Sequence, residues 1–147
     1  MATDRIEREI IINAPRDRVW AALTEADHVA QWFGDSAEVE LRPGGKLMFG
    51  WKEHGNHHAL VERVESPGFF SYRWARAAGA VPAAGNSTLV EFTLTPDGPG
   101  TRLRVVETGF AALDASEEEK DTAVKENTEG WISELGELQQ YAERLPA

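Results

Sequence analysis

The sequence predicts an α+β fold in which an antiparallel sheet closes around one long C-terminal helix and encloses an apolar pocket. Its 147 residues match the usual size of one domain, so we expect residues 1–147 to form a single unit. Between Ser36 and Gly109, apolar and polar residues alternate with a period of two, which is typical of antiparallel strands. From Ser116 to about Arg144, apolar residues recur instead at helical spacing.

One strand and two short helices are expected before the main part of the sheet. Ile6–Asn13 alternates in the manner of a half-buried strand. Pro15 suits the first position of a helix, because an N–H there would lack a helical partner anyway, and we expect this helix to continue to about Thr24. A second short helix is expected to have Asp27 as its N-cap and to end at Gly34.

Six further strands are expected, because turn-forming residues divide the region that follows. The first of them alternates over Ala37–Leu41. Val61 and Val64 are apolar but lie three residues apart, which predicts a bulge near Glu62 or Arg63. The predicted turns and loops are Pro43–Gly45, Glu53–Asn56, Ser66–Gly68, Ala77–Asn86 and Pro96–Gly100.

The C-terminal helix carries the clearest local signal. Ser116 and Glu119 have the spacing of a capping box. The negative charges of Glu117, Glu118 and Glu119 lie in the first turn, where they interact favourably with the positive end of the helix dipole. The predicted apolar stripe consists of Val124, Trp131, Leu135, Leu138 and either Tyr141 or Ala142. We expect this stripe to pack across the sheet.

Composition excludes several classes of protein. The chain has no cysteine, which rules out disulfides and thiolate metal sites and fits a reducing compartment. Its net charge of −10 would repel phosphate backbones, so we expect no binding to nucleic acid. The N-terminus is too charged for a signal peptide, and no apolar run approaches the roughly 20 residues that span a bilayer. We therefore expect a cytoplasmic protein without membrane insertion.

The histidines offer little for chemistry. His54, His57 and His58 lie within five residues, but a metal site needs three or four ligands in an ordered geometry, and no acidic partner has suitable spacing. We expect exposed turn histidines, with His58 as the one that could reach the rim of a pocket. No motif for a nucleophile or a phosphate loop is present. We therefore expect no metal, no cofactor and no catalytic residue.

Two polar residues are candidates for the pocket. Glu107 follows Leu103 and Val105 on the predicted inward face of the last strand. There it could act as a general base or bind a ligand amine; alternatively, the strand has already left the core and Glu107 lies at the rim. Asn127 precedes Trp131 by one helical turn, and it is either a ligand contact or a core polar group with its hydrogen bonds satisfied.

Aromatic residues are the main candidates for the pocket wall. Aromatic stripes also occur in plain cores, but buried Trp and Tyr need a partner for their polar atom, which favours a cavity wall. The predicted ligand site consists of Trp51, His58, Tyr72, Trp74, Glu107, Asn127 and Trp131, with Glu107 and His58 at its mouth.

Several short motifs, in this order of elements, carry a resemblance to a known family. They are Asn13–Pro15, Val19–Trp20, Trp32–Phe33, Pro43–Gly45, Val64–Pro67, Tyr72–Trp74, Gly130–Trp131, Leu135 and Leu138. With them the chain resembles the START-like superfamily, also called the helix-grip, Bet v-like or SRPBCC fold, and within it the branch named after the activator of the heat-shock-protein-90 ATPase. The resemblance covers nearly the whole chain. It implies a seven-stranded curved antiparallel sheet around the C-terminal helix, two short helices after the first strand, and a cavity between sheet and long helix.

The resemblance leaves function open, because members include lipid and hormone binders, aromatase/cyclases and chaperone regulators. Our leading hypothesis is non-enzymatic binding of a small apolar or aromatic molecule between the sheet and the C-terminal helix. The alternatives are a protein-interaction module that regulates a chaperone in the stress response, and a cyclase or hydrolase that uses pocket carboxylates. Both a monomer and a homodimer are compatible with these hypotheses.

Overall fold

A computed structural model describes residues 4–53 and 55–145 and shows one seven-stranded antiparallel sheet with strand order β1-β7-β6-β5-β4-β3-β2. The strands are β1 (Arg5–Ile12), β2 (Ser36–Val39), β3 (Lys46–Trp51), β4 (Gly55–Glu65), β5 (Phe69–Ala75), β6 (Ser87–Asp97) and β7 (Gly100–Thr108). The helices are α1 (Arg16–Thr24), α2 (Ala26–Trp32), the short 3-10 helix η1 (Phe110–Ala112) and α3 (Glu117–Arg144). This order confirms the predicted α+β fold, with η1 as an addition.

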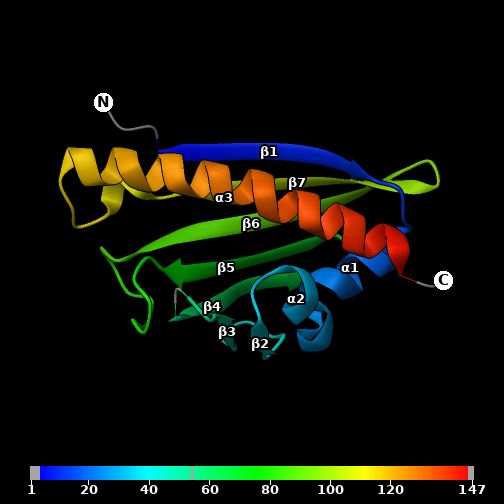
Figure 1. Cartoon of the computed structure of the whole chain (residues 1–147), viewed down its shortest axis with the longest axis horizontal. Coiled ribbons are helices and arrows are strands. Elements are labelled where there is room, and N and C mark those ends of the chain that lie inside the picture. The colour runs from blue at the N-terminus through cyan, green and yellow to red at the C-terminus, as the bar shows by residue number, and fades with distance from the viewer. Residues whose placement is uncertain (1–3, 54, 146–147) are drawn as a thin grey trace.

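Helix α3 lies across one face of the sheet, and its C-terminal end lies near α1 (Figure 1). Close to this end, Gln139 Nε2 donates to the Ile11 carbonyl oxygen of β1 at 2.7 Å. The helix is unbroken over 28 residues, as the sequence predicts. Its buried residues are Ala123, Trp131, Leu135, Leu138 and Ala142. The predicted stripe is therefore correct at its centre, whereas Val124 and Tyr141 are only partly buried. Ala123 is buried where the prediction had its neighbour Val124, and of the two alternatives predicted for the end of the stripe, Ala142 is the buried one.

The N-terminus of α3 has the predicted cap. The Glu119 backbone N–H donates to Ser116 Oγ at 3.1 Å, and the Ser116 hydroxyl donates to the Glu119 carboxylate at 3.0 Å. The cap satisfies a backbone donor that the first turn of the helix would otherwise leave unpaired. It fixes where α3 begins, and therefore which residues its inner face presents.

Helix α2 begins earlier than predicted. Asp27 lies inside its first turn, and Glu25 occupies the N-cap position without a capping side-chain hydrogen bond. The helix ends before Gly34, whose φ of +86° belongs to the left-handed region that glycine adopts without strain. A Cβ at this position would also lie 2.7 Å from the Gly50 carbonyl oxygen. This close approach holds Phe33 against the end of β3.

The sheet contains the predicted irregularity. The β4–β5 register shifts between Val61 and Arg63, which confirms the bulge expected from the apolar spacing. Strand β2 ends at Val39 rather than at Leu41, because the chain turns there and the Arg42 backbone N–H donates to the Glu40 carbonyl oxygen at 2.9 Å. No helix in the described part of the chain is long and apolar enough to cross a membrane.

Candidate functional site

Two adjoining hollows open between the sheet and α3. The first, which we call the Arg76 hollow, has a volume of about 200 Å³ and is lined by Trp51, His57, Trp74, Ala75, Arg76, Thr88 and Asn127. The second, the Glu134 hollow, has a volume of about 160 Å³ and is lined by Phe33, Trp51, Trp74, Glu126, Asn127, Gly130, Trp131 and Glu134. Because Trp51, Trp74 and Asn127 line both, we treat them as one elongated site.

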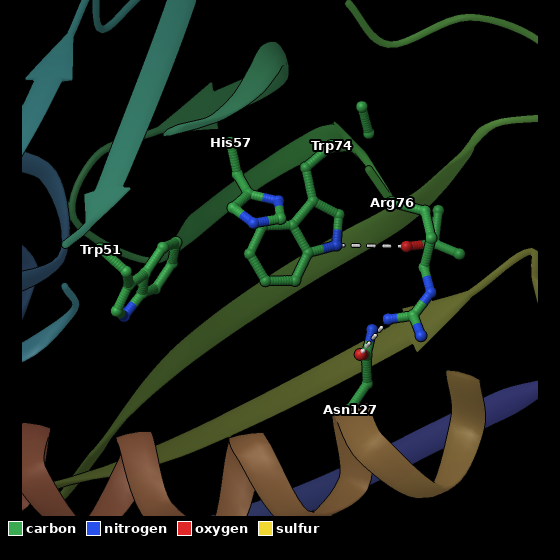
Figure 2. Close-up of a pocket in the computed structure, with 7 residues that line it drawn as sticks. Trp51, His57, Trp74, Arg76 and Asn127 are labelled. Carbon is green, nitrogen blue, oxygen red and sulfur yellow. Dashed lines mark hydrogen bonds between the residues drawn. The ribbon is translucent and has the colours of Figure 1, made fainter. Parts of the chain in front are cut away.

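Aromatic rings from four elements form the walls of this site. Phe33, just after α2, stacks on Trp131 of α3 with ring centroids 5.9 Å apart and an interplanar angle of 10°. It also lies 5.9 Å from the Trp74 ring of β5 and 5.1 Å from Trp51 at the end of β3. On the Arg76 side, the Trp51 ring meets His57 edge-on at 5.5 Å, and both rings line this hollow together with Trp74 (Figure 2).

Glu107 anchors two of these indoles from behind. Its side chain is 0% exposed. The Trp131 Nε1–H donates to Oε1 at 2.8 Å, and the Trp74 Nε1–H donates to Oε2 at 2.9 Å. The Thr88 hydroxyl donates to Oε2 at 2.6 Å, and Asn127 Nδ2 lies 3.1 Å from Oε1 and 3.0 Å from Oε2. Each oxygen therefore has donors, as a buried carboxylate requires.

The structure resolves the two sequence-based readings of Glu107. Alternation along β7 correctly indicates that the side chain points inward, and the reading that placed it at the rim is wrong. The expectation that Glu107 lies at the pocket mouth is also wrong, because the indoles of Trp74 and Trp131 stand between it and the hollows. Glu107 orients the walls of the site and does not line it.

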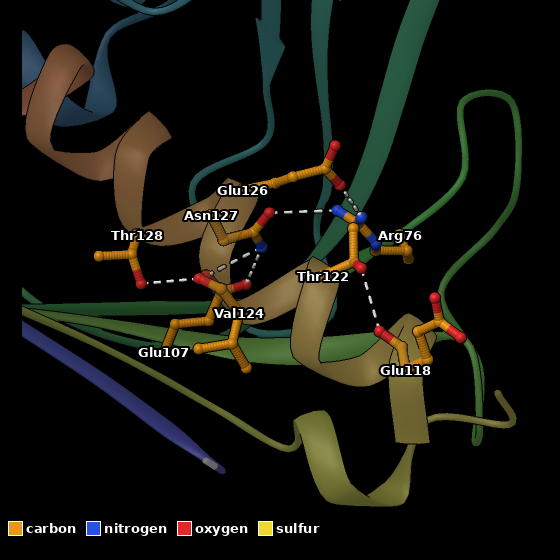
Figure 3. Close-up of polar contacts among 8 residues, drawn as sticks. All are labelled: Arg76, Glu107, Glu118, Thr122, Val124, Glu126, Asn127 and Thr128. Carbon is orange, nitrogen blue, oxygen red and sulfur yellow. Dashed lines mark hydrogen bonds and ion pairs between the residues drawn. The ribbon is translucent and has the colours of Figure 1, made fainter. Parts of the chain in front are cut away.

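Asn127 connects this buried carboxylate to an exposed arginine (Figure 3). Its Oδ1 accepts from Arg76 Nη1 at 3.1 Å, while its Nδ2 donates to Glu107. Arg76 Nη2 also pairs with Glu126 Oε1 at 2.5 Å. Asn127 is therefore a half-buried polar group with its hydrogen bonds satisfied, and it also lines both hollows. Its role as a ligand contact stays a prediction.

Besides Glu107, two more of the predicted site residues, Tyr72 and His58, do not line the hollows. Tyr72 is 2% exposed and packs in the core against Phe49 and Phe92, with ring centroids 5.6 and 6.0 Å away. The pKa of its phenol is raised, mainly by burial and to a smaller extent by the negative charge of Glu107. Tyr72 therefore stays protonated. Of the predicted set, Trp51, Trp74, Asn127 and Trp131 line the hollows.

His58 lies on the outer face of the sheet, and His57 lines the site instead. His57 is opposite Phe49 and His58 is opposite Met48, and the buried residues of β3 are Leu47, Phe49 and Gly50. His57 therefore shares the inner face with Phe49, and His58 shares the outer face with Met48. His54 lies outside the described residues.

Sequence reasoning missed two charged residues of the site. Arg76 follows the inward-facing Trp74 by two positions, so continued strand alternation would have indicated it. Glu134 follows Trp131 by three positions on α3, and such residues share a helix face. Burial and the nearby charge of Glu137 raise the pKa of the half-buried Glu134 carboxyl to about 7. Among the residues described, no three His, Asp or Glu side chains group so as to hold a metal ion.

Comparisons with known proteins agree with this architecture. The sequence profile of a family described as "Activator of Hsp90 ATPase homolog 1-like protein" matches residues 13–143. Protein MLL2253 from Mesorhizobium loti is 25% identical with a TM-score of 0.81, and the match covers 97% of this chain and 99% of that one. DynU16, described as a putative protein in the dynemicin biosynthetic locus, is 25% identical with a TM-score of 0.77, over 97% of this chain and 48% of that one.

A solution structure titled as the Aha1 dimer from Colwellia psychrerythraea has a TM-score of 0.78 and covers 97% of this chain and 98% of its own. At 18% identity, this likeness concerns the fold alone. Among curated proteins, no sequence matches the chain significantly.

Proposed function

The chain belongs to the family of activator of Hsp90 ATPase homolog 1-like proteins, and from this premise we propose that it binds a small apolar or aromatic molecule between the sheet and α3. The ligand would lie in the elongated site formed by the Arg76 and Glu134 hollows. Trp51 and Trp74 would contact it along its length, because both residues line both hollows. Asn127 and Arg76 would provide polar contacts at one end.

The observation that carries this proposal is a hollow with aromatic walls, two of whose indoles are fixed by hydrogen bonds to the buried Glu107. A dry cavity of about 150 Å³ is large enough for benzene, and the hollows measure about 200 and 160 Å³. Together they lie near the lower end of the range of roughly 300–1,000 Å³ that small-molecule sites occupy. Because hydrogen bonds to Glu107 fix the indoles of Trp74 and Trp131, little side-chain entropy would be lost on binding.

Thermal unfolding with a panel of flat aromatic compounds and fatty acids tests the proposal. A ligand that binds only the native state raises the melting temperature by mass action. Tryptophan fluorescence should change in the same titration, because three of the five tryptophans line the proposed site. Trp51→Leu should weaken both the melting shift and the fluorescence change, since this half-buried ring lines both hollows and would contact the ligand in each of them.

Ile132→Ala provides the matched control. Ile132 lies on α3 but is 55% exposed on its outer surface, so this variant should retain the binding response of the wild type. The absence of both a melting shift and a fluorescence change across the panel would exclude the binder proposal. A response that is as strong in Trp51→Leu as in Ile132→Ala would show that the ligand binds elsewhere.

A protein-interaction module that regulates a chaperone is the second candidate. The specific observation in its favour is the family itself, whose description refers to activation of the Hsp90 ATPase. The steady-state ATPase rate of a bacterial Hsp90, measured with and without this protein, tests it. A rate that rises in proportion to the added protein would favour this function, and an unchanged rate at saturating concentration would exclude it.

The third alternative, a cyclase or hydrolase that works through pocket carboxylates, has less support. Glu107 is fully buried and accepts hydrogen bonds from four side chains. A general base needs access to the proton that it removes. Glu107 lacks that access, because Trp74 and Trp131 separate it from the hollows.

A further inference from the structure

Glu134 lines its hollow, and one of its two carboxylate oxygens has no hydrogen-bond partner in the described part of the chain. Oε2 of Glu134 is buried and has no hydrogen-bond partner among the described residues. The two other carboxylates near the site are committed, since Glu107 accepts from four side chains and Glu126 pairs with Arg76. A buried carboxylate oxygen without a donor is costly, so a ligand that brings a donor gains binding energy there.

The charges around Glu134 favour a cationic donor over a neutral one. Within the described part of the chain, no ion pair joins Glu134 to a Lys, Arg or His side chain. The nearest charge that affects it is Glu137, of the same sign, and the chain as a whole carries a net charge of −10. A positive ligand group would thus meet attraction from Glu134 and find no competing protein cation beside it.

The walls of the same hollow also suit a cation. Trp51, Trp74 and Trp131 line it together with Phe33. A cation within about 6 Å of an aromatic ring centroid is attracted by the ring, and Trp attracts it most strongly. An ammonium group beside Glu134 would therefore have a carboxylate on one side and aromatic side chains around it, an arrangement that favours cations over neutral donors.

We propose that the natural ligand is an aromatic or apolar molecule with a protonated amine, which Glu134 binds in its own hollow while Trp51 and Trp74 hold the apolar part toward Arg76. This inference rests on the proposed function and specifies its ligand class. The opposite orientation is unfavourable, because it would place the ammonium group beside the Arg76 guanidinium, which lines the other hollow.

Three probes of nearly equal size and different charge test this inference by isothermal titration calorimetry. They are 1-naphthylmethylamine, 1-naphthalenemethanol and 1-naphthoate, used at pH 8 and low ionic strength. At this pH the amine is protonated and the Glu134 carboxyl, whose pKa is about 7, is mostly ionised. We expect the amine to bind at least tenfold more tightly than the alcohol, and the carboxylate to bind most weakly.

Glu134→Gln keeps the shape of the side chain and removes its charge. In this variant the affinity for the amine should fall to within about threefold of that for the alcohol, while the affinity for the alcohol stays unchanged. Glu129→Gln, an exposed position on the same helix, should retain the full preference for the amine. The comparison of the three probes on the wild type does not depend on the folding of any variant.

The outcomes separate this inference from the proposed function. Equal affinity for amine and alcohol in the wild type would overturn the inference and leave the binding function standing. A preference for the amine that persists in Glu134→Gln would also overturn it. If none of the three probes binds, the inference fails together with the proposed function.

Discussion

Replacing Glu107 with glutamine would turn one buried carboxylate oxygen into an amide nitrogen and leave the shape of the side chain unchanged. In the native protein, Oε1 accepts from Trp131 and Asn127, and Oε2 accepts from Trp74, Thr88 and Asn127. An amide nitrogen donates and does not accept. Wherever it is placed, it faces an indole N–H that cannot rotate to accommodate it.

The two orientations of the new amide differ in cost. With the nitrogen in place of Oε1, Trp131 would lose its acceptor. With the nitrogen in place of Oε2, the Thr88 hydroxyl can rotate to accept, and Trp74 Nε1 already lies 3.2 Å from Thr88 Oγ1. The second orientation is therefore favoured, although it still brings the nitrogen against Asn127 Nδ2.

The expected cost follows from the groups left without good partners. A buried polar group without a partner costs about 1–3 kcal/mol, and a lost hydrogen bond adds about 1 kcal/mol, so Glu107→Gln should lower the free energy of unfolding by about 2–4 kcal/mol. For a chain of this length, that corresponds to a fall in melting temperature of roughly 4–16 °C.

Urea unfolding, followed by both tryptophan fluorescence and circular dichroism, measures this change. The exposed Glu129→Gln on α3 is the control, and its free energy of unfolding should remain within about 0.5 kcal/mol of the wild type. If Glu107→Gln were equally neutral, the four donors would not depend on the carboxylate. The reasoning that Glu107 holds the indole walls would then be refuted.

Three further predictions follow from the packing, the helix cap and the buried charge. Trp131→Ala should lower the free energy of unfolding by about 3–5 kcal/mol, because the ring is 2% exposed; a loss below about 1 kcal/mol in urea unfolding would contradict its place in the core. Ser116→Ala should cost about 1 kcal/mol in thermal unfolding, whereas the exposed Ser133→Ala on the same helix should change stability little. The pKa of Glu134 is raised from 4.5 to about 7 in the folded state. The protonated Glu134 carboxyl therefore contributes to the free energy of unfolding in full below pH 4.5, and this contribution is lost as the pH rises through 7. Glu134→Gln should therefore reduce the fall in melting temperature between pH 5 and pH 8, and an unchanged slope would contradict the raised pKa.

Local chemistry made most of the secondary structure predictable. The turns predicted at Ser66–Gly68 and Ala77–Asn86 correctly delimit β5, which runs from Phe69 to Ala75. Ser116 and Glu119 located the start of α3, since a cap depends on residues within one turn. The N-cap of α2 was misplaced at Asp27, because no side-chain hydrogen bond marks that helix start and acidic residues are common throughout a first turn.

The predicted site residues were correct where it is enough to know which face of a strand or helix carries the side chain. They were wrong where the side chain's depth beneath α3 or the register of the strand matters as well. Tyr72 and Trp74 share one face of β5, yet Tyr72 lies in the core and Trp74 lines the hollows. Alternation gives the face of a residue but not its position beneath α3. The choice of His58 over His57 failed because a shift of one residue reverses the face of every side chain on a strand.

The sequence by itself determined the order of the elements and the aromatic character of the inner surface, because each depends on spacing along one strand or helix. It left open whether Glu107 points inward or lies at the rim, and its burial in the folded protein decided this. Only the tertiary structure decided which partners Glu107 has. Its donors come from β5, β6 and α3, which meet only after the sheet has formed and the helix has packed on it. The same packing leaves Oε2 of Glu134 buried with no hydrogen-bond partner among the residues that the structure describes, since desolvation and missing donors arise from neighbours that are distant in the chain.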